Sequence, residues 1–320
     1  MGYYNRISSA FEAAPVLTLC KGSKYVMISD CHRGIGTWGD NFLKNQNLYF
    51  AALEYYYKNG FTYIELGDGD ELWENRKMEQ IIEIHGNVFW LMSLFLREKR
   101  LYMIYGNHDM VKKNQTYIKN HCASYYCTAT KNKEELFKSV PFYEGIILKG
   151  CGTKSPNFSC CPAVPSQNSY GSSHNSGLPT IYLTHGHQAS LLNSTLWKLS
   201  RFMVRYIWAP LERFGVLDPT SAAKNNTVKT KTEKKLSYWA ENEHRILMTG
   251  HTHRPVMGSA SSPYFNTGSC VHPRCITCIE IIGERIFLVK WTLSTRSDYS
   301  LYVSREVLEQ GNLSEFTEFI

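Results

Sequence analysis

Five short polar clusters follow apolar, strand-like runs and together hold six of the eleven histidines. Imidazole nitrogen and carboxylate oxygen are the ligands that hold Zn, Mn and Fe in proteins. Ligands of α/β sheets bind at the carboxyl ends of the strands, so we expect the clusters to converge on one multinuclear metal centre. They are Asp30-Cys31-His32, Gly67-Asp68, Gly106-Asn107-His108-Asp109, His185-Gly186-His187 and Gly250-His251-Thr252-His253.

Each cluster alone also has an ordinary explanation. Asp30 could cap the next segment, and a Gly-Asp pair such as Gly67-Asp68 is usually a turn. The cluster 106–109 is harder to explain in this way, because four special residues abruptly end an apolar run. The recurrence of all five clusters at strand ends favours a shared site over five separate turns.

The elements that must position these residues alternate regularly in the first half of the chain. Apolar strands are expected at 25–29, 61–66 and 101–105, with a helix over 41–59 and helices over 75–99 interrupted near Gly86. The second half predicts short strands and a hairpin turn at Gly283-Glu284. We therefore predict an α/β fold, a four-layer α/β/β/α sandwich. Its later strands are 145–148, 180–184, 245–249, 263–265, 275–281 and 285–293.

Two segments interrupt this pattern within what we expect to be a single domain over 1–320. Residues 150–177 are rich in Ser, Gly, Pro and Asn, which predicts a flexible surface loop. Residues 188–242 leave the strand pattern and predict a helical cap insertion, with a solvated loop over its Lys-rich part at 224–235.

Composition restricts the class of protein. Hydrophobic residues make up 43% and charged residues 20%, which is typical of a globular protein. No run reaches the roughly 18–20 apolar residues needed to span a bilayer, and we find no signal-peptide pattern. Ten cysteines then indicate reduced thiols and a cytoplasmic protein. A zinc site at Cys270, Cys275 and Cys278 is disfavoured by their spacing. The net charge of +7 suits an anionic substrate or membrane surface.

The ordered series D-x-H, G-D, G-N-H-D, H-G-H and G-H-T-H resembles the calcineurin-like metallophosphoesterase superfamily, and it covers residues 30–253. Protein Ser/Thr phosphatases have G-N-H-E where this chain has G-N-H-D, so that branch is disfavoured. The helical insertion, the run 250–255 and the run 266–269 look more like the UDP-2,3-diacylglucosamine pyrophosphatase group. That group usually has Arg in place of His108 and a carboxylate in place of His187.

The resemblance implies two divalent metal ions, manganese first, with iron or zinc as alternatives. A carboxylate can bridge two cations, and Asp68 is the implied bridge. Two cations about 3.5–4 Å apart can hold a hydroxide that attacks phosphorus. The implied ligands are Asp30, His32 and His253 for one metal, and Asn107, His185 and His251 for the other.

The resemblance also suggests catalytic roles. We expect His108 to hydrogen-bond the phosphoryl group and protonate the departing oxygen, with Asp109 fixing its tautomer. Asp70 and His187 are expected to contact the metal ligands and hold them in position, without binding the metals themselves. Candidate substrate contacts are Arg33 and Arg254 beside the ligands, and Trp197, Arg201 and Arg205 in the insertion.

The resulting hypothesis is a dinuclear metal-dependent phosphoesterase that hydrolyses a small or lipid-linked phosphate ester or pyrophosphate. The insertion could be a lid over the metal centre, an amphipathic helix on an anionic membrane, or a helical pair packed on the domain. One alternative is a nuclease or cyclic-nucleotide phosphodiesterase with the same centre, although no nucleic-acid module is recognisable and we do not expect that partner. Another is a non-catalytic scaffold. The oligomeric state stays open.

Overall fold

The computed structural model describes residues 1–37, 39–151, 177–212 and 225–316. Its largest element is a seven-stranded sheet with the order β14-β13-β12-β2-β3-β4-β7. β2, β3, β4 and β7 run parallel, whereas β12, β13 and β14 form an antiparallel edge. The strands are β2 (Lys24–Ile28), β3 (Thr62–Leu66), β4 (Leu101–Ile104), β7 (Phe142–Tyr143), β12 (Cys275–Ile282), β13 (Arg285–Thr295) and β14 (Leu301–Asn312).

A second sheet has five strands in the order β1-β8-β9-β10-β11. β9, β10 and β11 are parallel to one another, and β8 pairs antiparallel with β9. β5 (Ser124–Cys127) and β6 (Asn132–Glu135) form a separate hairpin. The strands of the five-stranded sheet are β1 (Val16–Leu19), β8 (Gly145–Gly150), β9 (Ile181–Thr184), β10 (Ile246–Thr249) and β11 (Tyr264–Asn266).

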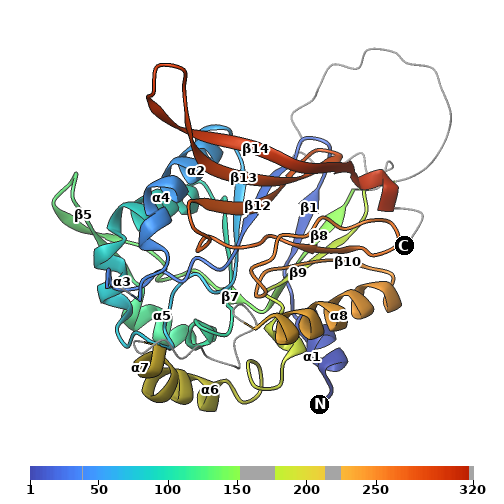
Figure 1. Cartoon of the computed structure of the whole chain (residues 1–320), viewed down its shortest axis with the longest axis horizontal. Helices are drawn as coiled ribbons and strands as arrows, with labels where there is room; N and C mark the ends of the chain where they lie inside the picture. The colour runs from blue at the N-terminus through green and yellow to red at the C-terminus, as the bar shows by residue number, and fades with distance from the viewer. Residues whose placement is uncertain (38, 152–176, 213–224, 317–320) are drawn as a thin grey trace.

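The two sheets lie face to face, with helices on the outer side of each (Figure 1). A buried apolar layer that includes Ile64, Leu66, Leu183 and Met248 fills the space between the sheets. The four-layer α/β/β/α prediction is therefore confirmed. The outer layers are α2 (Gln46–Lys58), α3 (Met78–Ile84), α4 (Gly86–Arg97) and α5 (Gln115–His121) on the seven-stranded side, and α1 (Tyr3–Ser9) and α8 (Asn226–Asn242) on the other.

The insertion after β9 starts as a run of short helical segments. These are α6 (Trp197–Met203), a π-helical stretch (Val204–Trp208) and α7 (Ala209–Glu212). Within the described residues, no helix is long and apolar enough to cross a bilayer. Short 3₁₀ turns occur at Leu43–Asn45, Met110–Lys113, His187–Ala189 and Leu313–Phe316.

The structure corrects one prediction in this insertion. The part of 224–235 that is described belongs to α8, not to a solvated loop. The Asn225 side chain caps this helix by accepting hydrogen bonds from the backbone N–H groups of Thr227 and Val228. Leu236 and Trp239 anchor it in a buried cluster against β10 and β11. A polar helix of this kind is stabilised by one apolar stripe rather than by its average composition.

The outer strands β1 and β14 are further differences from the sequence-based prediction, which did not include them. Most of the predicted loop at 150–177 lies outside the described residues. The Gly283-Glu284 turn is confirmed, because Gly283 joins β12 to β13 with a φ of 60°.

Candidate metal centre

The predicted ligands lie at the carboxyl ends of five strands drawn from both sheets. Those from the seven-stranded sheet follow β2, β3 and β4, and those from the five-stranded sheet follow β9 and β10. Parallel pairing within each sheet brings these ends to one edge. There the side chains form two triplets, each with ligand atoms within 4.8 Å of one another. The triplets are Asp30, His32 and His253, and Asp68, His185 and His251.

These residues share an unusual backbone conformation. Left-handed φ values are uncommon for residues other than glycine and cost about 1–3 kcal/mol each. Such strain persists only where the surrounding structure enforces it, and it is common at functional sites. The left-handed conformation is found here at Asp30 (φ 53°), His32 (49°), Asp68 (51°), His251 (70°) and His253 (58°).

Close packing of the strand ends explains the glycine before two of the ligand loops. A Cβ atom at Gly106 would collide with the Asp68 carboxylate, and one at Gly250 would collide with Asp30. Only glycine lets the backbone approach the carboxylates this closely.

One oxygen of each aspartate is fixed by protein donors, and the other faces imidazole nitrogens. Asp68 Oδ1 accepts a hydrogen bond from the His108 N–H at 2.8 Å, whereas Oδ2 lies 3.1 Å from His185 Nε2. Asp30 Oδ2 accepts from the His251 N–H at 2.9 Å, whereas Oδ1 lies 3.1 Å from His253 Nε2.

The tautomers leave lone pairs facing each other. His185 Nδ1 donates to the Leu66 carbonyl at 2.9 Å, so in the neutral ring Nε2 presents a lone pair to Asp68 Oδ2. Two facing acceptors repel unless a cation or proton lies between them. Among described residues, His185 Nε2, Asp30 Oδ1 and Asn107 Oδ1 are buried without a hydrogen-bond partner. This donor set fits divalent cations.

The electrostatics show the same excess of acceptors. Burial alone would raise the pKa of Asp30, but His253 and His185 outweigh it and hold the pKa well below its usual range. Burial opposes protonation of His185, yet the carboxylates of Asp68 and Asp30 raise its pKa to about 9. Burial and the neighbouring His185 lower the pKa of His251 to about 3. The raised pKa of His185 favours a proton in the position between His185 and Asp68 that a cation would fill.

Glu71 is the important residue that the sequence analysis missed. Its carboxylate lies 2.8 Å from Nδ1 of His32 and 2.8 Å from Nδ1 of His108. The indole of Trp73 stacks on the His108 ring, with 4.3 Å between centroids. Burial would lower the pKa of His108, but Glu71 and Asp68 raise it. The only sequence signal for this role was the position of Glu71 three residues after Asp68.

The expected role of Asp109 is therefore wrong. Its Oδ1 accepts from the Gly106 N–H at 2.7 Å, and its Oδ2 lies 2.9 Å from Lys112 Nζ. Asp109 shapes the loop after β4, and Glu71 orients His108 instead.

Arg33 and Asp70 also differ from expectation. Arg33 is completely buried, donating to both Glu65 oxygens at 2.8 Å and to Asp70 at 2.7 Å. It cannot reach a substrate from this position. Asp70 pairs with Arg33 and Lys112 rather than with a candidate ligand. These residues form a buried ionic network beneath the metal centre.

The remaining predicted substrate contacts have different surroundings. Arg254 is half-exposed and paired with Glu233. The guanidinium of Arg205 donates to the carbonyls of Leu72 and Trp73, which ties the insertion to the loop after β3 and leaves it a structural role. Arg201 lies over the Trp197 ring at 4.9 Å. Trp197 itself lines a cavity together with His187.

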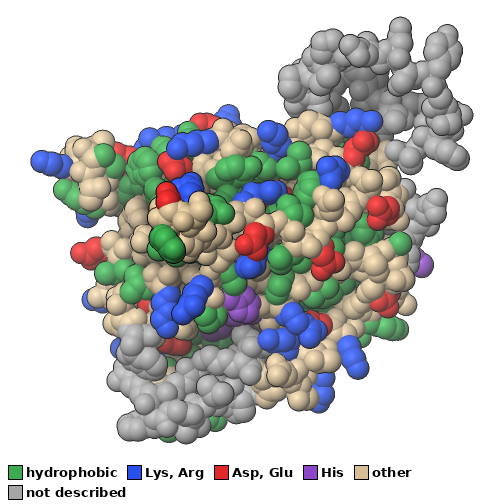
Figure 2. Space-filling model, turned by 45° about the horizontal axis from the view of Figure 1, so that its top comes forward, with side chains coloured by type: hydrophobic (Ala, Val, Ile, Leu, Met, Phe, Trp, Pro, Cys, Tyr) green, Lys and Arg blue, Asp and Glu red, His purple; other side chains and the backbone are tan. Residues whose placement is uncertain are grey.

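The centre is accessible to solvent through its histidines. The side chains of His32, His108 and His253 are 10, 21 and 13% exposed, whereas His185 is fully buried. Figure 2 shows histidine side chains gathered near the middle of one face, with Lys and Arg side chains on both sides of them.

No protein-family model and no curated protein matches the sequence. Among solved structures, vacuolar protein sorting 29 from Cryptosporidium parvum aligns with a TM-score of 0.38 and 12% identity, over 90% of this chain and 98% of that one. Vps29 from Chaetomium thermophilum aligns with a TM-score of 0.37 and 11% identity, over 91% and 98%. Similarity at this level carries no information about the chemistry of this chain.

Proposed function

We propose that this chain is a phosphoesterase of the calcineurin-like metallophosphoesterase type that works with two divalent cations. One observation supports this above all. Asp68 belongs to one of two neighbouring triplets of ligand-type side chains, and its second oxygen faces His185 Nε2 at 3.1 Å, an arrangement that a cation between them would stabilise.

The residues that would hold the cations are those of the two triplets, with Asn107 completing the second and Asp68 shared by both. Mixed nitrogen and oxygen ligands suit manganese, iron or zinc, and manganese is our first choice. When bound, such a pair supplies Lewis-acid activation of water and neutralises phosphoryl charge.

The protein's own acid would be His108. Glu71 lies 2.8 Å from its Nδ1 and, with Asp68, raises its pKa above the ordinary value against the effect of burial, which favours the protonated ring. Its ring centroid lies 4.6 Å from that of the candidate ligand His32, which supports a role beside a phosphate held at the metals. A protonated imidazole there can donate to the phosphoryl oxygens and then give its proton to the leaving oxygen.

For the substrate, we propose a small or lipid-linked phosphate ester or pyrophosphate. Apolar side chains of the insertion favour the lipid-linked form, since Leu199 is 51%, Phe202 55% and Tyr206 51% exposed. Exposed apolar residues beside cations such as Lys198 and Arg201 suit an anionic bilayer. Sedimentation with vesicles containing phosphatidylserine should retain the protein, and F202E should release it.

Turnover of bis(p-nitrophenyl) phosphate by the manganese-loaded protein tests the function itself. D68A and H251A should abolish turnover and reduce bound metal measured by mass spectrometry. H121A is the matched control, because His121 is a half-exposed histidine that pairs with Glu79. Near-normal turnover by D68A, or a wild-type protein that binds no metal, would overturn the proposal.

A further inference from the structure

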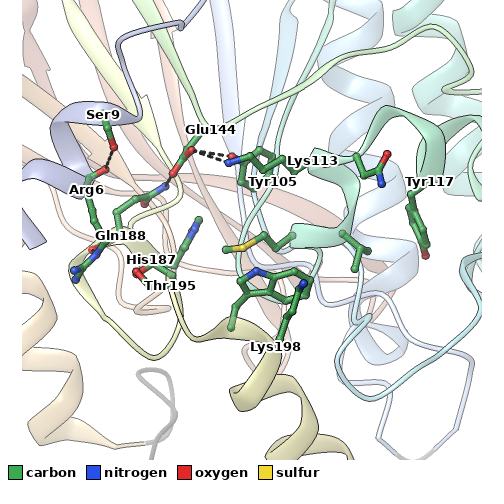
Figure 3. Close-up of a pocket in the computed structure, with 15 residues that line it drawn as sticks. Arg6, Ser9, Tyr105, Lys113, Tyr117, Glu144, His187, Gln188, Thr195 and Lys198 are labelled. Atoms are coloured by element: carbon green, nitrogen blue, oxygen red, sulfur yellow. Dashed lines mark hydrogen bonds and ion pairs between the residues drawn. The ribbon is translucent and has the colours of Figure 1, made fainter. Parts of the chain in front are cut away.

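A cavity of about 770 Å³ is lined by His187, which follows the candidate ligand His185 by two residues (Figure 3). The ring centroid of His187 lies 5.5 Å from that of His185 and 6.4 Å from that of Tyr105. Tyr105 directly precedes the G-N-H-D loop. A volume of this size is in the range of sites for small organic ligands. His187 is therefore the residue that links this cavity to the candidate metal centre.

One buried polar atom in the wall is without a partner. His187 is 1% exposed, and its Nδ1 has no hydrogen-bond partner among described residues. In Figure 3 its ring lies between Gln188 on one side and Tyr105 on the other. A buried polar atom left unsatisfied costs about 1–3 kcal/mol, so a ligand that hydrogen-bonds it would recover that free energy.

The charge around the cavity is positive. Arg6, Lys113 and Lys198 contribute three cations from α1, the 3₁₀ turn 110–113 and α6, and Figure 3 shows them on three different sides. Glu144 is the one carboxylate among the lining residues, and it is engaged by the Tyr105 hydroxyl at 2.9 Å and by Lys113 at 3.8 Å. Among described residues, Arg6 and Lys198 have no carboxylate partner. The cavity therefore has cations in excess, and they are spaced apart.

The rest of the lining indicates what lies between the charges. Trp197 lines the cavity, and an indole is a group against which the CH groups of a ring can pack. Hydroxyl and amide groups complete the wall and suit a ligand with several hydroxyls. They belong to Gln188, Ser194, Thr195 and Asn114.

We propose that this cavity binds a polyhydroxylated ring that carries phosphate groups at separate positions, such as a sugar bisphosphate or a cyclitol polyphosphate. The inference rests on the proposed phosphoesterase function, since one phosphate is held at the metal centre. A second phosphate contacts the cations that line the cavity, Arg6, Lys113 and Lys198. The ring hydroxyls hydrogen-bond His187 and the hydroxyl and amide groups of the lining. Contiguous phosphates, as in a nucleoside diphosphate, fit the separated cations less well.

The test compares kcat/KM of the manganese-loaded protein for four substrates. We expect fructose 1,6-bisphosphate or myo-inositol 1,4-bisphosphate to exceed fructose 6-phosphate at least tenfold, and the better of the two identifies the ring as sugar or cyclitol. ADP should be poorer than either. In the double variant K113Q/K198Q, the ratio of kcat/KM for the better bisphosphate to kcat/KM for fructose 6-phosphate should fall at least tenfold, because KM for the bisphosphate rises.

K119Q is the matched control, because Lys119 is an exposed lysine of α5 that does not line the cavity. It should keep the preference of the wild-type protein. Turnover of bis(p-nitrophenyl) phosphate separates the two hypotheses. If that ester is hydrolysed but neither bisphosphate is preferred, or if ADP is best, the cavity assignment is overturned and the phosphoesterase stands. If no ester is hydrolysed, the phosphoesterase proposal and the cavity assignment fall together.

Discussion

The carboxylate of Glu71 joins His32 to His108, with 2.8 Å to Nδ1 of each ring. One of these histidines is a candidate metal ligand and the other the candidate acid. A single carboxylate therefore sets the tautomer of both and leaves both Nε2 atoms available to the centre.

We expect E71Q to lower kcat/KM about 10- to 100-fold, the usual effect of losing a group that orients a ligand. Loss of the Glu71 charge should also lower the pKa of His108, which Glu71 raises. If protonated His108 is the acid, the alkaline limb of the pH–rate profile shifts to lower pH. E79Q, at an exposed carboxylate, is the control. An unchanged pH profile in E71Q would contradict this role.

H108A should slow turnover by about 10²-fold or more, a typical contribution of a general acid. The loss should be largest for alkyl phosphate esters, whose leaving oxygen needs the proton, and smaller for nitrophenyl esters. The measurement is the ratio of rates for the two ester types in the variant and the wild-type protein. Equal losses for both would assign His108 to binding rather than to proton transfer.

Manganese should stabilise the folded protein, because it relieves the facing acceptors at Asp68 and His185. A ligand at 100 times its Kd adds about 2.7 kcal/mol to the free energy of unfolding. Melting curves with excess manganese and with EDTA check this, and D68N should reduce the difference between them. Superimposable curves for the wild-type protein would show that no cation binds the fold.

Asp40 should make stability depend on pH in the acid range. Burial would raise its pKa, but His85 at 2.9 Å and the Gly36 N–H lower it. A carboxyl with a lowered pKa in the folded state contributes stability above its unfolded pKa of about 4, and this is lost as the pH falls through the folded value. We expect D40N to destabilise the protein at pH 7 and to flatten the acid limb of unfolding free energy against pH.

The strand ends were predictable from sequence because each apolar run stops at a cluster of polar residues. Hydrophobic periodicity and composition indicate that Asp30 and His251 lie at the ends of strands. Parallel pairing then brings such strand ends to one edge of each sheet. The burial of Arg33 was not predictable, because its partner Glu65 lies on β3, far from it in the sequence, and is recognised as a partner only from its own burial.

Glu71 was missed for a related reason. Its role depends on two rings that approach it from β2 and β4, and no spacing within one segment reveals that meeting. The first part of helix α8, up to residue 235, was missed because the helix is polar on average and has a single buried stripe that includes Leu236 and Trp239.

The candidate ligands come from both halves of the sandwich: Asp30, His32 and Asp68 from one sheet, His185, His251 and His253 from the other. Two bound cations would thus link the two sheets of the sandwich. Each of the two ligand triplets draws on both sheets, so a fragment that ends before β9 would lack at least one ligand of each triplet. Packing of the two sheets and binding of the cations would then be cooperative. The site would be complete only when the loop after β10, which carries the last ligands, has folded.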